Sequence, residues 1–238
     1  MRLIPVLDIL NRVVVRGVAG NRDQYQPLES CLTNSVQPLD VARALRSRFG
    51  FHEVYVADLD AIMHGRAGHD LCRQLIADGF HLLVDAGVSD PEQAERVLGT
   101  GAERVIVGLE SCPSPAVLRA IVEAVTADRV LFSLDLKSGI PLGSAPWGSD
   151  AARIASLAID CGVGRLIVLD LAGVGAGAGV PTLPLCQQIR AAHGGAIEII
   201  TGGGVRDADD LKLLEQAGID GVLVASVLHR ADCWLGGG

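Results

Sequence analysis

The chain has 238 residues, of which 49% are hydrophobic, and its formal net charge is −8. This composition excludes a disordered chain, and the acidic balance argues against nucleic acid as a partner. No uncharged apolar stretch is long enough for a membrane span. The six cysteines form no CxxC pair. We therefore expect reduced thiols in a cytoplasmic protein that has no signal peptide.

Short runs rich in Val, Ile and Leu alternate along the chain with amphipathic stretches. The runs are too short for helices and predict strands. The expected strands are Leu3–Leu7, Glu53–Ala57, His81–Val84, Arg104–Val107, Val130–Leu134, Arg165–Leu169, Ile197–Ile200 and Gly221–Val224. The expected helices are Leu39–Phe49, Leu71–Asp78, Pro91–Leu98, Val117–Val125, Ala151–Ile159, Leu183–Ala192 and Asp209–Gln216, with a last one after Ser226.

This alternation predicts an α/β protein with a buried parallel sheet. Eight strand–helix units in 238 residues fit a (β/α)₈ TIM barrel that occupies the whole chain as one domain, residues 1–238. A doubly wound open sheet is the alternative fold. It is less favoured because no GxGxxG sequence follows the first expected strand.

Two halves of the chain resemble each other. The segment from Leu82 to Asp90 aligns without gaps with the segment from Ile199 to Asp207, so that Gly87 matches Gly204 at an offset of 117 residues. The same offset pairs the following strands. We therefore expect two similar half-barrels, at about residues 1–127 and 128–238.

Several expected strands end in a carboxylate, and function in a barrel sits where strands end. These residues are Asp8, Asp58, Asp85, Asp135 and Asp170, with Glu110 just after the fourth strand. We expect about half of them to be structural. Asp8 and Asp135 occupy equivalent places in the two halves, so they are the expected catalytic pair. Two carboxylates on opposite sides of a substrate can divide the roles of acid and base.

A glycine-rich turn follows the seventh expected strand. Gly202, Gly203 and Gly204 let backbone N–H groups approach an anion, and Ala225 and Ser226 form the turn after the eighth strand. The loops after strands seven and eight are the usual phosphate site of barrels. We expect Gly203, Gly204, Ala225 and Ser226 to bind a phosphate group of a small substrate.

Other residues near the expected barrel mouth leave alternatives open. Asp58, Asp85, Asp170 and Lys137 are possible substrate contacts, although Lys137 is more typical of a solvated loop lysine. The carboxylates could instead hold Mg²⁺, but we expect no metal and no cofactor, because no pair of histidines has metal-ligand spacing. The polar stretch 21–27 is either a mobile lid or a plain surface loop.

Four segments together resemble the histidine-biosynthesis isomerase and cyclase barrels. They are Ile4–Gly17, Val56–Ala61, Phe132–Gly139, and Gly202–Arg206 with Ala225-Ser226. Trp147 is also placed as in the isomerase, and the resemblance covers nearly the whole chain. It implies a phosphate-binding barrel in which Asp8 and Asp135 act as the base and acid of an Amadori-type isomerisation, in either order.

The sequence also departs from that family. The family has a phosphate site in each half, and the N-terminal one should read Gly-Gly-Gly-Ile-Arg. Here it reads Asp85-Ala86-Gly87-Val88-Ser89, and Glu110 follows the next strand. After the sixth strand, Leu169 and Val174 stand where the isomerase has Thr and Asp, in a loop that has lost its polar groups.

These departures favour a biosynthetic isomerase, or a lyase or synthase, acting on a small sugar or aldehyde monophosphate; family members beside pterin-cofactor genes fit this hypothesis. One alternative is the true histidine-pathway isomerase, which acts on phosphoribosylformimino-AICAR-phosphate. Another is a non-catalytic phosphate-binding or scaffold subunit. The sequence gives no oligomeric state.

Overall fold

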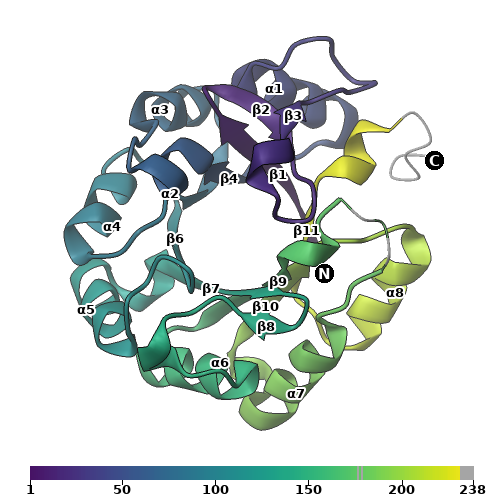
Figure 1. The fold of residues 1–238 in the computed structure, drawn as a ribbon. Coiled ribbons are helices and arrows are strands. Elements are labelled where there is room, and N and C mark those ends of the chain that lie inside the picture. Colours follow the sequence, from purple (N-terminus) through teal and green to yellow (C-terminus); the bar gives the residue numbers. More distant parts are fainter. Residues whose placement is uncertain (176, 178, 231–238) are drawn as a thin grey trace.

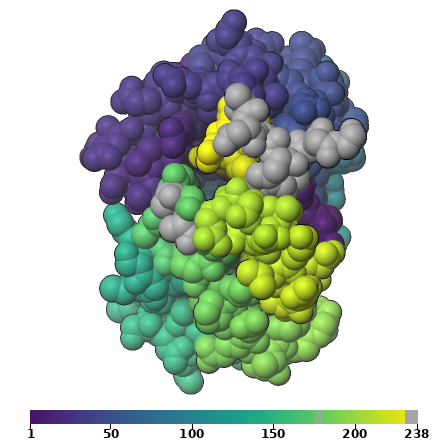
Figure 2. Space-filling view, turned by 90° about the vertical axis from the view of Figure 1, so that its right-hand side faces the viewer, coloured from purple at the N-terminus to yellow at the C-terminus, as the bar shows by residue number. Residues whose placement is uncertain are grey.

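A computed structural model describes residues 1–175, 177 and 179–230, in which parallel strands close into a barrel (Figure 1). In ring order the strands are β1 (Arg2–Leu10), β4 (Glu53–Asp58), β5 (His81–Asp85), β6 (Arg104–Gly108), β7 (Val130–Lys137), β9 (Arg165–Asp170), β10 (Glu198–Gly202) and β11 (Gly221–Val224). Strand β11 pairs with β1 from Arg2–Gly221 to Pro5–Val224. Figure 2 shows the first and last segments of the chain side by side. The closure confirms the predicted barrel, and the open-sheet alternative is wrong.

The helices surround the ring of strands (Figure 1). They are α1 (Pro38–Phe49), α2 (Leu59–His64), α3 (His69–Ala77), α4 (Pro91–Leu98), α5 (Pro115–Val125), α6 (Ala151–Asp160), α7 (Leu183–His193) and α8 (Ala208–Gln216). Several begin at a side-chain cap, which satisfies an N–H group that has no partner inside the helix. The Asp90 carboxylate accepts from the N–H of Gln93, and Pro91 occupies the first turn, as the sequence predicts.

Some short elements were not predicted. Strand β2 (Val13–Arg16) turns back against β1, and β3 (Gln26–Pro27) pairs with β2, so the stretch after β1 is an antiparallel extension of the barrel. A 3₁₀ turn, η1 (Arg22–Gln24), lies between them. Strand β8 (Ile140–Pro141) pairs with the end of β7. After Ser226 there is a short 3₁₀ helix, η6 (Ser226–His229), and residues 231–238 lie outside the described part.

The core has two layers, because each strand sends alternate side chains inward and outward. The outward side chains pack against the helices. The inner cluster contains one large apolar side chain from every barrel strand: Ile4, Tyr55, Leu83, Ile106, Leu131, Ile167, Ile200 and Leu223. This layer fills the barrel below the mouth. Inward positions further along each strand therefore line the mouth, which places Asp85 two residues after Leu83 on the inner face.

The internal repeat is visible in the elements. Strand β5 and strand β10 match at the offset of 117 residues, and so do the starts of β6 and β11 and of α4 and α8. Strands β5 and β10 are four places apart in the closed order, so they lie on opposite walls. The two turns that the sequence alignment equates therefore face one another across the barrel.

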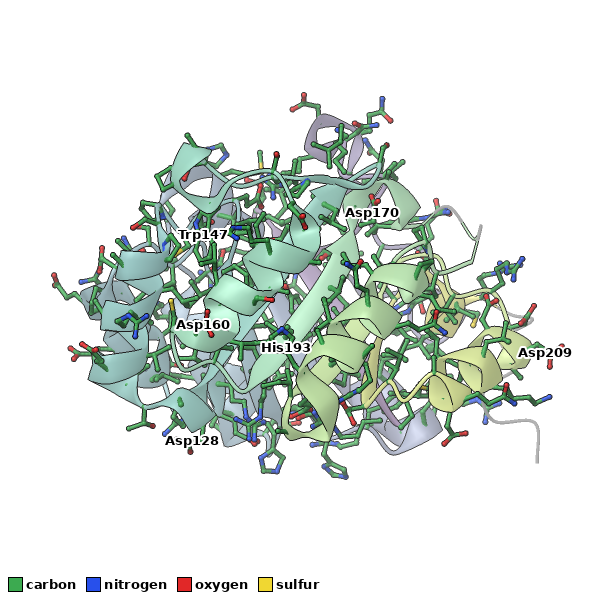
Figure 3. All side chains as sticks on the ribbon, turned by 90° about the horizontal axis from the view of Figure 1, so that it is seen from below. Asp128, Trp147, Asp160, Asp170, His193 and Asp209 are labelled. Carbon is green, nitrogen blue, oxygen red and sulfur yellow. The ribbon has the colours of Figure 1, made fainter. Side chains whose placement is uncertain are left out.

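Charged side chains cluster at the amino ends of the strands. Arg2 binds Glu53 and Glu198, and Arg165 also binds Glu198. Figure 3 shows Asp128 at this end of the molecule and Asp170 at the other. Because these ion pairs occupy the amino ends of the strands, we expect a functional site at the carboxyl ends.

The described helices include none with the length and apolar character needed to cross a bilayer. The described cysteines, which are Cys31, Cys72, Cys112, Cys161 and Cys186, are all free thiols. Cys233 lies outside the described residues.

Candidate active site

A cavity of about 640 Å³ opens at the carboxyl ends of the barrel strands. Its walls come from β1, β4, β5, β7, β9 and β11 and from the loops after several strands, including the turn after β10. Of the residues predicted for the site, seven line it: Asp8, Asp85, Asp135, Gly203, Gly204, Ala225 and Ser226. Glu110 also lines it. The fold thus brings the predicted carboxylates and the predicted glycine turn into one cavity.

Asp8 and Asp135 lie on opposite walls of the cavity. Strands β1 and β7 are four places apart in the closed order, and each aspartate follows its strand's inner core residue, Ile4 or Leu131, by four positions. Burial raises the pKa of Asp8 to about 6, and the nearby Arg22 guanidinium limits the rise. In the described part of the chain no donor is hydrogen-bonded to the Asp8 carboxylate. Its oxygens face the cavity with no hydrogen-bond donor among the described residues.

Asp135 is more enclosed, with 7% of its surface exposed. Its Oδ1 accepts from Ser133 Oγ at 2.6 Å, and its Oδ2 accepts from the N–H of Leu109 at 3.1 Å. Burial raises its pKa to about 8, and the charges of Asp85 and Glu110 add to the effect. The hydrogen bonds oppose the rise because they stabilise the charged form. Asp135 therefore carries a proton at neutral pH.

Asp85 and Glu110 make one end of the cavity acidic. The Asp85 carboxylate accepts from Tyr55 Oη at 3.1 Å and from the N–H of Gly87 at 3.1 Å. Burial raises its pKa to about 6. Glu110 forms an ion pair with Arg22, which reaches across from η1. We name Asp85, Glu110 and Asp135 the acidic pole.

The opposite end of the cavity is a glycine turn. Gly203 and Gly204 have φ angles of 78° and 101°, in the left-handed region that favours glycine. A Cβ on Gly204 would lie 2.2 Å from the carbonyl oxygen of Gly179, so no other residue fits there. Asp207 caps α8, as predicted, and accepts from the N–H groups of Asp209 and Asp210. We name Gly203, Gly204, Ala225 and Ser226 the glycine pole.

The loop after β9 closes the side of the glycine pole. Leu169 and Val174 line the cavity, where the family resemblance leads us to expect polar groups. A Cβ on Gly17 would lie 3.0 Å from Val174 Cγ1 and 3.0 Å from Asp8 Oδ2, so Val174 packs beside the Asp8 carboxylate. Residues 176 and 178 of this loop lie outside the described residues. The described side of the loop gives the cavity an apolar wall.

Three possible substrate contacts lie away from this cavity. Asp58 follows Val56 on the outer face of β4. Its carboxylate caps α2 by accepting from the N–H of Ala61, and it also accepts from the N–H of Gly68. Asp170 accepts from the N–H groups of Ser138, Gly139 and Ala172 and holds the β7–β8 turn (Figure 3). Lys137 is exposed and does not line the cavity. These placements fit structural or solvated roles, and substrate contact by these residues stays a prediction.

Trp147, which the resemblance places as in the isomerase, lies in the outer core. Its indole is 1% exposed and packs on Phe132 at a ring distance of 5.0 Å, with Nε1 donating to the Cys112 carbonyl. The tryptophan is part of the outer core and does not line the cavity.

Several cavity residues were missed by the sequence reasoning. Tyr55 was predicted only as part of a strand. It stands two residues before Ala57 and so shares the inner face of β4, and this spacing could have shown that it points toward the cavity. Arg22 and Tyr25 belong to the polar stretch 21–27, which lines the cavity and is tied to Glu110. His229 is buried, and its Nδ1 shares a hydrogen bond with Ser30 Oγ. Burial lowers its pKa to about 4. It is therefore neutral.

The carboxylates at the mouth do not form a metal site among the described residues. Among them no group of three or more His, Cys, Asp or Glu side chains has the geometry to hold a metal ion. The carboxylates of the acidic pole are instead bound to Ser133, Tyr55, Arg22 and backbone N–H groups. This arrangement suits proton transfer.

Comparison with known proteins places the chain in a family. The model of the histidine biosynthesis protein family matches residues 2–233. An uncharacterized protein of Methanocaldococcus jannaschii is 32% identical over 97% of this chain and 94% of its own length. The HisF subunit of imidazole glycerol phosphate synthase from Leifsonia xyli is 30% identical, over 99% of this chain and 92% of its own.

An isomerase is also similar. An imidazole-4-carboxamide isomerase of Prosthecochloris aestuarii, whose name carries two phosphoribosyl groups, is 28% identical over 98% of this chain and 88% of its own length. With the closed barrel and the paired aspartates at its mouth, these matches show that the chain belongs to the histidine biosynthesis protein family.

Proposed function

We propose that the chain is an enzyme, an isomerase or a lyase or synthase, that acts on a small sugar or aldehyde monophosphate. The observation that carries the proposal is the difference between the two ends of the cavity. A glycine turn with Ser226 suits one phosphate group, whereas Asp85 and Glu110 occupy the matching place on the other wall. A second phosphate there would meet carboxylates at close range and be repelled.

The protonation of the two aspartates divides their roles. Asp135, with a pKa of about 8, is protonated at pH 7 and serves as the general acid. Asp8, with a pKa of about 6, is mostly ionised at pH 7 and serves as the general base. Both lie near the working pH, which is where proton transfer is most effective. Their positions on opposite walls let them act on different faces of one substrate.

An isomerisation of the Amadori type would then proceed in three steps. Asp135 gives its proton to the ring oxygen of an aldose-amine as the bond from that oxygen to C1 breaks, leaving an iminium at C1. Asp8 removes the proton from C2, and that electron pair forms the C1–C2 double bond and neutralises the nitrogen. The Asp135 carboxylate then takes the hydroxyl proton of the resulting enol, and Asp8 returns its proton to C1, which gives the ketose-amine and restores both groups.

A panel of phosphorylated compounds tests the proposal by thermal shift. A ligand that binds the folded state raises the melting temperature according to its concentration relative to Kd. We expect sugar or aldehyde monophosphates to stabilise the protein, and Ser226→Ala to weaken that effect. Stabilisation by bisphosphates alone would overturn the proposal, since it needs two phosphate sites.

The histidine-pathway isomerase is the second candidate. Its support is the 28% identity to a relative that bears that isomerase's name. Rescue of a histidine-isomerase auxotroph by this chain would establish it. Under the monophosphate proposal, we expect no rescue, even when the protein accumulates in soluble form.

A further inference from the structure

Two buried carboxylates of the acidic pole meet across a residue that has no side chain. Asp85 lies on β5 and Asp135 on β7, the two strands that flank β6. The inward position of β6 between them is Gly108. A Cβ built there would lie 3.1 Å from Asp135 Oδ2 and 4.0 Å from Asp85 Oδ2. The missing side chain leaves the carboxyl groups facing each other through a small gap.

Both groups accept two hydrogen bonds, so the difference in burial decides which one ionises first. Asp85 accepts from Tyr55 Oη and from the N–H of Gly87, and both bonds stabilise its charged form. Asp135 accepts from Ser133 and Leu109 but is the more enclosed of the two. Once Asp85 is ionised, a second negative charge across the gap is disfavoured. The proton that remains is then held on Asp135.

We propose that Asp85 is a positioning residue, whose charge, acting through the gap at Gly108, keeps the proton on Asp135 and so maintains the general acid at neutral pH. The inference rests on the proposed function for the use of that proton. It also gives the acidic pole a second purpose besides excluding a phosphate. The glycine that matches Asp85 in the other half, Gly202, could not exert this effect.

Other charged and titratable groups also face Asp135. Glu110 follows β6, but it is paired with Arg22. Tyr55 faces it from β4 with its hydroxyl bound to Asp85, and Asp8 lies on the opposite wall. Among the described residues Asp85 forms no ion pair and faces Asp135 across Gly108, so removing it should change the titration of Asp135 more than removing any of the others.

Carbon-13 NMR of carboxyl-labelled aspartates across pH 4 to 10 tests this directly, with no substrate present. In the unaltered protein we expect one step near pH 6, in which Asp8 and Asp85 both titrate, and one near pH 8 for Asp135. Asp85→Asn should lower the Asp135 step by about one pH unit or more. Asp135→Asn should leave the Asp85 step in place, because Asp85 ionises while Asp135 is still neutral.

Asp23→Asn is the matched control, because Asp23 is an exposed carboxylate of η1 outside the acidic pole. It should leave both steps unchanged. If Asp85→Asn does not fold, Asp85→Gly carries the same expectation and restores the residue type of the other half. An Asp135 step that does not move in either variant would overturn the inference. If the Asp135 step moves in these variants but the unaltered protein turns over no monophosphate, the inference stands and the proposed function is rejected.

Discussion

The two ends of the cavity are built from matching parts of one repeat, yet they differ in charge. The turns after β5 and β10 align residue for residue, so Asp85 matches Gly202, Gly87 matches Gly204, and Ser89 matches Arg206. One turn presents a carboxylate and the other a backbone open to an anion. Two turns that match in sequence position and backbone can therefore present opposite surfaces to one cavity, one acidic and one of exposed backbone.

Neutralising the catalytic pair should produce the largest effect. Asp8→Asn removes the base and Asp135→Asn removes the acid, so each should lower kcat about 10²- to 10⁴-fold. Phosphate binding at the glycine pole should persist, since neither residue belongs to it. Steady-state kinetics on the compound found by thermal shift, with phosphate titration alongside, measures both. Normal turnover by both variants would contradict the assignment of Asp8 and Asp135 as base and acid.

Converting the acidic pole into a glycine pole is the sharpest test of the comparison. The double variant Asp85→Gly/Ser89→Arg removes a carboxylate and supplies a guanidinium, which binds phosphate through charged hydrogen bonds. We expect inorganic phosphate or a bisphosphate to bind this variant roughly 10- to 100-fold more tightly, as measured by calorimetry. Unchanged affinity would mean that Asp85 and Ser89 do not decide the number of phosphates. Ser89→Arg alone is the control for the added charge.

The rate should follow a bell-shaped curve in pH. Asp8 must be ionised, so activity should fall about tenfold for each pH unit below about 6, where its pKa lies. Asp135 must be protonated, so activity should fall similarly above about 8. The profile of kcat/KM for the free enzyme measures both limbs. A single limb would show that only one of the two groups transfers a proton in the rate-limiting step.

The same carboxyl groups should make stability depend on pH. The folded-state pKa values of Asp8 and Asp135 lie above the ordinary value of 3.8, so the folded protein holds protons that the unfolded chain releases. Their contribution to stability is therefore greatest below about pH 4 and declines as the pH rises to about 8. Melting temperatures measured over that window should show the decline, and Asp135→Asn should flatten it.

The smallest expected effect is at the glycine pole. Ser226→Ala removes one hydroxyl donor while the backbone of the turn remains, so phosphate should bind roughly two- to tenfold more weakly. The variant Ser89→Ala, in the matching turn after β5, should bind phosphate as the unaltered protein does. Equal losses in both variants would show that phosphate does not choose between the poles.

Much of the fold and part of the site follow from the sequence, for identifiable reasons. The runs rich in Val, Ile and Leu give the barrel strands, and β11 has the predicted bounds, Gly221–Val224. The placement of Asp8 and Asp135 follows from the repeat. Asp58 and Asp170 were harder to place, because both faces of a buried strand are apolar and alternation does not show which face points inward.

Contacts between distant segments lay beyond local patterns. The pairing of Arg22 with Glu110 joins residues 88 positions apart. The hydrogen bond from Tyr55 to Asp85 joins the neighbouring strands β4 and β5. Neither leaves a signal in sequence spacing. The burial that raises the pKa of Asp135 likewise depends on the closed barrel, since it comes from all the surrounding strands.

The central claim is that the cavity has one phosphate-binding end. A crystal structure of the protein soaked in inorganic phosphate tests it most directly. The account predicts one anion, bound at Gly203, Gly204 and Ser226, and none beside Asp85 and Gly87. Two anions at the symmetric turns after β5 and β10 would contradict it.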